Sequence, residues 1–300
     1  FCKRERKIAE AQLSRALGAT DSVASEVVAD VFAHVGETAA EIMIGERLLA
    51  SSSGGPATPF FEHHPDDALI AAWRSKTGAI ALSGHLGNFE LLAANYVHQG
   101  VDLSVIGRRP NYPEFAAWLE QQRSKLGLQT LWREDPRSAA KIVRAVKRGG
   151  VVGVLIDQDV NLENRFSEFF GLPAASPIGP IRIALRYRLP IVTSFSYRVA
   201  RLRHVVVSHP LAYELQNDPG PEQFEEALRF VLREYNRRLE ELLRAAPAQW
   251  PWWHRRWRRQ PGIDYEREPE KLRSTNDYVA WLRNTAPPPK TDAERSACSN

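Results

Sequence analysis

The chain has 300 residues, of which 43% are hydrophobic and 25% are charged, so it carries enough apolar residues for a substantial core and is not disordered as a whole. The net charge is +4 and the pI is about 9.1, which suits an anionic lipid surface, phosphorylated sugars, an acidic carrier protein or nucleic acid. The two cysteines lie at opposite ends, which argues against a disulfide framework or a zinc site and favours a reducing, cytosol-facing environment.

Helical and strand-like stretches alternate along the chain. Residues 7–49 have apolar residues at helical spacing, which predicts two or more helices, and residues 51–56 are predicted to form a loop. Beyond this loop we predict strands at Ala79–Leu82, Leu103–Ile106, Gln129–Leu131, Val151–Ile156, Ile191–Tyr197 and His204–Val207. The predicted helices are Asn88–Gln99, Tyr112–Leu126, Arg137–Lys147, Ile178–Tyr187 and Pro221–Arg244. This alternation predicts an α/β fold, with a mixed, largely parallel sheet covered by helices and an antiparallel pair formed by the last two strands.

The sequence also suggests how the chain is divided. We predict an N-terminal helical segment (1–50), an α/β domain (51–261), and a C-terminal helix with a flexible tail (262–300), in which the tail begins at Pro287. The sequence contains no run of ~18 apolar residues, so no membrane-spanning helix is predicted within it.

His85 and Glu90 are the most informative residues. The strand Ala79–Leu82 leads directly through a Ser-Gly pair to His85, which places an imidazole at the carboxyl end of a sheet strand. Ligands bind outside the carboxyl ends of strands in such sheets, and Asp157 also follows a strand, so both belong to one site. Glu90 lies on the first turn of the next helix, where we expect its carboxylate to fold back onto the imidazole. The pair is typical of a general base and its orienting partner.

These residues point to activation of a hydroxyl group. A neutral imidazole can accept a proton from an alcohol near neutral pH. Ser83 does not lie in a Gly-x-Ser-x-Gly nucleophile elbow, which argues against an esterase of the α/β-hydrolase type. We therefore favour direct attack of an acceptor hydroxyl on an acyl donor. From the two residues alone, an alternative remains open, in which His85 is an ordinary loop histidine and Glu90 a solvated first-turn residue.

Four blocks in order carry a family resemblance. They are His-x4-Glu at His85, then Asp157-Gln158-Asp159, then Phe169-Phe170-Gly171, and finally the segment from Pro247 to Trp257. From about Cys2 to about Pro261 the chain resembles the lipid A biosynthesis acyltransferases, a branch of the lysophospholipid acyltransferase superfamily. The resemblance implies transfer of a fatty acyl chain from acyl carrier protein to a hydroxyl of a lipid A precursor, at the cytoplasmic face of the inner membrane. It implies His85 and Glu90 as the catalytic pair, and no metal or other cofactor.

Two departures leave parts of this reading open. Family members normally begin with a hydrophobic anchor helix, whereas this chain begins at Phe1 and continues with charged residues, so we expect a truncated chain whose anchor is not included. The Gly87-Asn88 pair occurs widely in related branches. Acylation of phosphatidylinositol mannoside or another membrane lipid from acyl-CoA therefore stays an alternative, as does a non-catalytic lipid-binding protein on the same scaffold.

Several residues are predicted to bind substrate. The predicted set is Asn88, Arg108, Arg123, Asp157, Gln158 and Asp159. Arg108 and Arg123 have the guanidinium fork that suits phosphate oxygens, although exposed arginines are mostly solvated. Asp157 is predicted to orient a site arginine or the acceptor, against the alternative of a plain loop turn. Phe166, Phe169 and Phe170 either line the acyl-chain tunnel or are ordinary core aromatics.

The segment from Trp250 to Gln260 contains four tryptophans and four arginines. We interpret it as a contact with the membrane or a glycolipid, because tryptophan suits lipid headgroups and arginine suits phosphates. In the alternative, Trp252 and Trp253 simply cap the core, and the segment could also do both. A nucleic-acid surface would also combine aromatic and basic residues, but the α/β alternation does not suggest a nucleic-acid-binding fold. The expected partners are therefore acyl carrier protein or acyl-CoA, a phosphoglycolipid and a membrane surface, with no nucleic acid.

Overall fold

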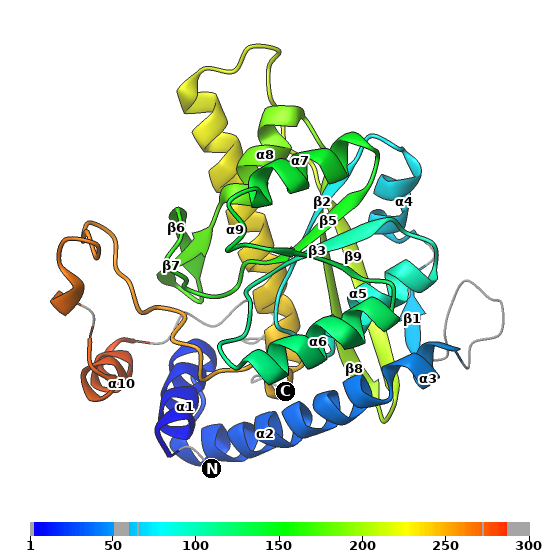
Figure 1. Ribbon diagram of the computed structural model, residues 1–300. Coiled ribbons are helices and arrows are strands. Elements are labelled where there is room, and N and C mark those ends of the chain that lie inside the picture. Colours follow the sequence, from blue (N-terminus) through cyan, green and yellow to red (C-terminus); the bar gives the residue numbers. More distant parts are fainter. Residues whose placement is uncertain (1–2, 51–59, 65, 272, 287–300) are drawn as a thin grey trace, which may run out of the picture.

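The structure, a computed structural model, describes residues 3–50, 60–64, 66–271 and 273–286 (Figure 1). Within these residues the central sheet has seven strands in the order β1-β9-β8-β2-β5-β3-β4. They are β1 (Phe61–His63), β2 (Ala79–Ser83), β3 (Leu103–Gly107), β4 (Gln129–Trp132), β5 (Val151–Leu155), β8 (Ile191–Ala200) and β9 (Arg203–Leu211). Neighbouring strands pair in parallel except β8 and β9, which are antiparallel. The predicted mixed, largely parallel sheet and its antiparallel pair are confirmed.

Helices cover both faces of this sheet (Figure 1). They are α1 (Lys3–Leu17), α2 (Asp21–Met43), α3 (Gly45–Ala50), α4 (Ala68–Arg74), α5 (Phe89–His98), α6 (Pro113–Lys125), α7 (Ser138–Lys147), α8 (Gly179–Tyr187), α9 (Pro221–Ala245) and α10 (Thr275–Asn284). Side chains alternate between the two faces of a strand. Along β2, Ile80 and Leu82 therefore pack with α8 and α9, whereas Ala79 and Ala81 pack with α4 and α5.

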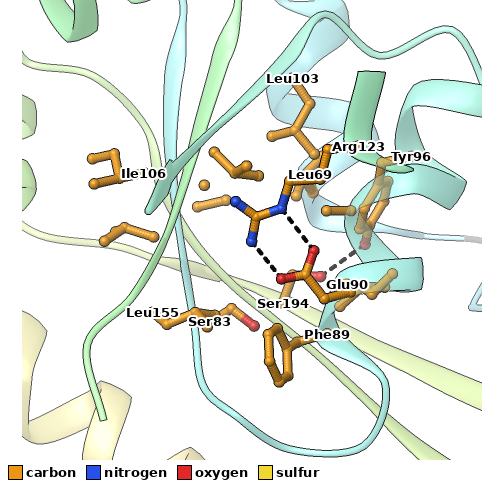
Figure 2. Close-up of a pocket in the computed structure, with 16 residues that line it drawn as sticks. Leu69, Ser83, Phe89, Glu90, Tyr96, Leu103, Ile106, Arg123, Leu155 and Ser194 are labelled. Atoms are coloured by element: carbon orange, nitrogen blue, oxygen red, sulfur yellow. Dashed lines mark hydrogen bonds and ion pairs between the residues drawn. The ribbon is translucent and has the colours of Figure 1, made fainter. Parts of the chain in front are cut away.

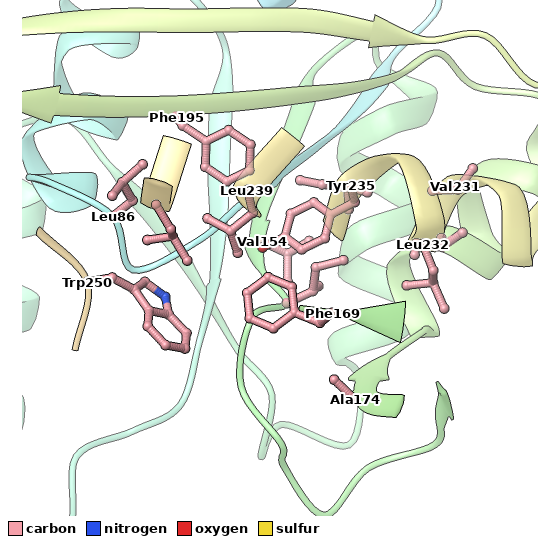
Figure 3. Close-up of a cluster of buried hydrophobic side chains, with 14 of the residues drawn as sticks. Leu86, Val154, Phe169, Ala174, Phe195, Val231, Leu232, Tyr235, Leu239 and Trp250 are labelled. Carbon is pink, nitrogen blue, oxygen red and sulfur yellow. The ribbon is translucent and has the colours of Figure 1, made fainter. Parts of the chain in front are cut away.

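The larger of the two cores lies under α9. Figure 3 shows Tyr235 of this helix near Val154 of β5 and Phe195 of β8, and Leu232 and Leu239 belong to the same core. The amphipathic pattern predicted for this helix, with apolar residues three and four positions apart, is what buries one of its faces. The core includes Leu82 of β2 and Val154 of β5, so it packs against the carboxyl ends of both strands.

The predicted N-terminal helical segment is confirmed, and it belongs to the same packed body as the sheet. The apolar face of α1 joins the larger core, and α1 packs against α10 near the other end of the chain. The longer α2 runs along the lower edge in the view of Figure 1. Among the described residues, no helix is long and apolar enough to cross a membrane. The predicted loop at 51–56 and the predicted tail from 287 to 300 lie outside the described residues.

Strand β1, helix α4 and a second, two-stranded sheet were not predicted from the sequence. This hairpin consists of β6 (Asn164–Phe169) and β7 (Leu172–Pro177). Its two-residue turn has positive φ at both positions, 49° at Phe170 and 72° at Gly171. Such turns usually carry Asn-Gly or Asp-Gly, so a phenylalanine at the first position hid the signal. The hairpin begins shortly after Asp157, so it positions the segment that follows this residue.

Candidate active site

His85 lies in a tight loop between β2 and α5, and two glycines make room for it. At Gly84 a side chain would meet the carboxylate of Asp157 at 3.1 Å, so a small residue lets this carboxylate approach the loop. Gly87 has a φ of +59°, and a side chain there would meet the backbone oxygen of Ser196 at 2.2 Å. Both positions of the loop therefore favour glycine. The side chain of His85 is 24% exposed in this loop.

Asp157 is the partner of His85, and strand register brings the two together. Ser83 of β2 lies opposite Leu155 of β5, so the residues two positions further along each strand leave the sheet side by side. The Asp157 carboxylate accepts hydrogen bonds from the His85 backbone N–H and contacts Nδ1 of its ring, both at 2.7 Å. Trp250 Nε1 donates to the same carboxylate at 2.8 Å. The aspartate is fully buried and holds the imidazole at Nδ1. This position corrects its predicted role as a substrate-binding residue.

The charge of Asp157 fixes the tautomer of His85. Burial alone would raise the pKa of Asp157, but the charge and hydrogen bonds of His85, with Trp250, outweigh it and hold that pKa well below its usual range. An ionised carboxylate can only accept hydrogen bonds, so Nδ1 of His85 carries the proton. Nε2 is then the unprotonated ring nitrogen, and its lone pair is what a general base requires.

Glu90 does not contact His85, which corrects the prediction that it orients the imidazole. Its carboxylate forms a two-pronged ion pair with Arg123 of α6, with Arg123 Nε at 3.0 Å and Nη2 closer still. Figure 2 shows the two side chains facing each other in an otherwise largely apolar cavity, the inner cavity, between α5 and the sheet. The structure thus keeps Glu90 and Arg123 together near the site, with Phe89 between this cavity and the ring of His85.

Asn88 is buried, and both ends of its side-chain amide are hydrogen-bonded within the protein, which corrects its prediction as a substrate ligand. Its side-chain oxygen accepts from the Leu91 backbone N–H at 3.1 Å and caps α5, while its amide donates to Glu41 of α2 at 2.8 Å. Glu41 also accepts from Arg198 at 3.1 Å and contacts His204 at 3.2 Å. This buried charge cluster ties α2 to the start of α5, directly after the His85 loop.

The other predicted ligands divide into near and distant residues. The amide nitrogen of Gln158 lies 3.2 Å from Nε2 and 3.3 Å from Nδ1 of His85, so Gln158 borders the imidazole, and its binding of substrate stays a prediction. Asp159 is instead held by Arg259, through its Nε at 2.5 Å and its backbone N–H at 2.9 Å. Arg108 is exposed and donates to Asn111 at 3.2 Å, and it lines no cavity whose lining includes His85 or Gln158.

His254 is a site residue that sequence analysis did not single out. Its ring centroid is 5.9 Å from that of His85. Burial and the nearby charge of His85 lower the pKa of His254 to about 4, so its imidazole is neutral at neutral pH. Within the described part of the chain, no side-chain hydrogen bond is formed by this ring. The only sequence signal for His254 was its position inside the run Trp-Trp-His-Arg-Arg. This whole run was interpreted as a contact with the membrane or a glycolipid.

Two spaces of different character meet at His254, beside His85. The apolar groove lies between α2 and the segment that follows α9, and its lining includes Val31, Val35, Ile42, Phe89, Pro251 and Trp253 together with His85 and His254. The polar pocket lies beyond His254, and its lining includes Arg4, Glu5, Gln158, Arg255 and Arg258. A substrate with an apolar chain and a polar, anionic part could therefore reach the imidazole from both sides.

The chain matches a known protein family over most of its length. A family model described as bacterial lipid A biosynthesis acyltransferase matches residues 1–259. The chain belongs to this acyltransferase family. A search of curated proteins found no match. Membership confirms the resemblance carried by the four ordered blocks and gives the chain acyltransferase activity in lipid A biosynthesis in general terms.

Most tryptophans in the aromatic segment of this acyltransferase are core residues, which corrects their prediction as surface residues, whereas contact of the rest of the segment with a membrane or glycolipid stays a prediction. Trp250, Trp252 and Trp257 are buried, and Arg256 is buried beneath the hairpin, where Nη2 donates to Ser176 at 2.7 Å. Only part of the segment faces the site, notably Trp253, which stacks on Phe32 of α2 with 5.3 Å between ring centroids.

The predicted acyl-tunnel aromatics also belong to the core. Phe169 and Phe170 are fully buried and pack edge to face at 4.9 Å between centroids. Neither lines the apolar groove or the inner cavity. Phe166 is half-buried and likewise borders neither space. The alternative of ordinary core aromatics therefore describes the first two.

Proposed function

We propose that this acyltransferase transfers a fatty acyl chain from a thioester to a hydroxyl of a phosphoglycolipid, a lipid A precursor being the favoured acceptor. The observation that carries the proposal is the His85–Asp157 pair, held on neighbouring strands where an apolar groove meets a polar pocket. Acyl carrier protein is the favoured donor. The mildly basic surface supports an acidic carrier and an anionic acceptor.

The reaction uses His85 as a proton carrier. Nε2 takes the proton of the acceptor hydroxyl as its oxygen attacks the thioester carbonyl carbon. When the C–S bond breaks, the proton passes from the imidazolium to the departing thiolate, so one ester and one thiol are formed. The buried carboxylate of Asp157 stabilises the imidazolium between these steps without taking its proton.

The apolar groove is the proposed place of the acyl chain. It borders His85 directly, and most of its lining comes from apolar side chains of α2 and of the segment after α9. Each CH₂ group removed from water contributes ~0.8 kcal/mol, so a fatty chain gains much more there than in the polar pocket. Met43 and Ile44, at the end of α2, are exposed and support an approach to a membrane surface on this side, at the cytoplasmic face of the inner membrane.

His254 is the proposed donor to the carbonyl oxygen of the thioester. Negative charge develops on this oxygen during attack, and a preorganised donor lowers the barrier by stabilising it. A neutral imidazole keeps an N–H for this purpose without competing with His85 for the proton. The low pKa of His254 and its lack of another side-chain partner in the described residues support this role.

His254→Ala is expected to lower kcat by about 100-fold with little change in KM, because an oxyanion donor acts in the transition state. His254→Asn should recover part of the loss, because its amide also donates. The measurement is steady-state kinetics of thiol release, with thermal unfolding of each variant. The exposed His98→Asn provides a matched control. A rise in KM at unchanged kcat would assign His254 to ground-state binding and contradict the proposed role.

Acyl transfer in detergent micelles tests the function itself. The purified protein would be given labelled acyl carrier protein or acyl-CoA, each against a lipid A precursor and a phosphatidylinositol mannoside. We expect an ester on the lipid A precursor, with acyl carrier protein as the better donor, and no product with His85→Ala.

The alternatives predict different products. Ester on phosphatidylinositol mannoside alone, or from acyl-CoA alone, would replace the favoured acceptor or donor. Free fatty acid with every acceptor would indicate an esterase. Lipid binding that His85→Ala retains, without product from the unaltered protein, would indicate a non-catalytic lipid-binding protein and overturn the proposal.

A further inference from the structure

The polar pocket contains more positive charge than its acidic residues neutralise. Three guanidinium groups line it, from Arg4, Arg255 and Arg258. Asp159 contributes little negative charge to the space, because its carboxylate is almost fully buried and already accepts two hydrogen bonds from Arg259. Glu5 is the other acidic residue of the lining, so the pocket keeps an excess of positive charge.

Two of these cations are held unusually close together. Arg4 Nε and Arg255 Nη2 both donate to the hydroxyl of Thr275, at 3.0 Å and 2.8 Å. Arg255 also donates to the Arg273 backbone oxygen at 2.9 Å, which fixes its guanidinium. Burial, Arg4 and Arg258 together lower the pKa of Arg255, as expected for crowded like charges. An anion between these groups would relieve the repulsion.

The pocket is also next to the reactive imidazole. Gln158 lines it and contacts both ring nitrogens of His85, and His254 lines both this pocket and the apolar groove. An anion bound here would therefore belong to a molecule whose reacting group lies at His85. Planar guanidinium groups match phosphate oxygens in pairs, which favours phosphate over a carboxylate at a site with several arginines.

We propose that Arg4, Arg255 and Arg258 form a subsite for a phosphate group of one of the two substrates. The inference rests on the proposed acyl transfer for the position of the substrates, but the binding of phosphate does not require turnover. Two sources share this chemistry. One is the phosphate of the donor's pantetheine arm, and the other is a phosphate on the acceptor headgroup.

Arg258→Ala is the most informative substitution. Its side chain is 31% exposed, and its guanidinium makes a long contact of 3.5 Å with Asp159, which Arg259 already neutralises. Its loss should therefore disturb the fold little. Arg267 is 87% exposed and pairs with Asp264 at 3.4 Å away from the pocket lining, so Arg267→Ala removes the same charge as a matched control.

The first measurement is calorimetric titration with inorganic phosphate at fixed ionic strength, in a His85→Ala background that excludes turnover. We expect Arg258→Ala to weaken phosphate binding about tenfold or more, since a charge-assisted pair is lost, and Arg267→Ala to leave it unchanged. Arg258→Lys should lie between, because it keeps the charge and loses the fork. No phosphate binding, or equal binding by Arg258→Ala, would overturn the subsite.

Kinetics then identify the source. With active protein, Arg258→Ala should raise KM for the donor if the pantetheine phosphate occupies the subsite, or KM for the acceptor if the headgroup phosphate does. Unchanged KM for both would overturn its assignment to a substrate. If phosphate binds as expected and no acyl transfer occurs, the subsite stands and the proposed function fails, so the two failures are distinguishable.

Discussion

Replacing Asp157 by asparagine is expected to lower kcat by about 10⁴-fold, close to the effect of His85→Ala. The carboxylate accepts from both the backbone N–H and Nδ1 of His85, and an amide cannot supply two charged acceptors. Asparagine therefore allows the wrong tautomer and removes the charge that stabilises the imidazolium. The measurement is kcat for thiol release, with thermal unfolding to confirm that Asp157→Asn is folded.

Glu90→Gln is the comparison that separates the two carboxylates. Glu90 pairs with Arg123 and does not contact His85, so this variant should lose less kcat than Asp157→Asn. It should also lower thermal stability, because Arg123 loses its charged partner. If Glu90→Gln lost as much kcat as Asp157→Asn while its thermal stability stayed unchanged, the assignment of Asp157 as the partner of His85 would be contradicted. Glu90 would then again be the catalytic partner.

Glu41→Ala is expected to destabilise the protein by about 3–5 kcal/mol, the largest effect on stability that we predict. The side chain of Glu41 is 5% exposed and pairs with Arg198, whose side chain is 8% exposed. Removing the carboxylate leaves Arg198 and His204 without this charge and frees the amide of Asn88. Urea unfolding measures the loss. The exposed Glu62→Ala serves as a control and should change stability by less than about 0.5 kcal/mol.

The same cluster predicts a pH dependence. Burial would raise the pKa of Glu41, but hydrogen bonds from His204, Arg198 and Asn88 lower it from 4.5 to about 2. A group with a depressed folded-state pKa stabilises the protein above its unfolded pKa and loses that contribution as the pH falls. The contribution, about 3 kcal/mol, should thus disappear between pH 4.5 and about 2. Glu41→Gln should flatten this part of the stability profile, and an unchanged slope would contradict the linkage.

Much of the fold could be predicted because its signals are local. The apolar run that forms β5 and the helical spacing that forms α9 are properties of consecutive residues. The hairpin of β6 and β7 was missed because its turn is shaped by tertiary packing around the buried Phe170. The Trp250 segment was misplaced for a related reason. Tryptophan and arginine suit both a lipid surface and a core with partners for their polar atoms, and composition does not distinguish the two.

By itself, the sequence determined the α/β fold, the family and His85 at a strand end, since each helix, strand or motif block that indicates them is a pattern of residues close together in the chain. Only the tertiary structure decided which carboxylate serves His85. Glu90 is five positions away, but the direction of α5 turns it toward Arg123. Asp157 is 72 positions away, but the register of β2 and β5 sets it beside the imidazole. Strand register depends on contacts across the sheet, and no local pattern around His85 encodes it.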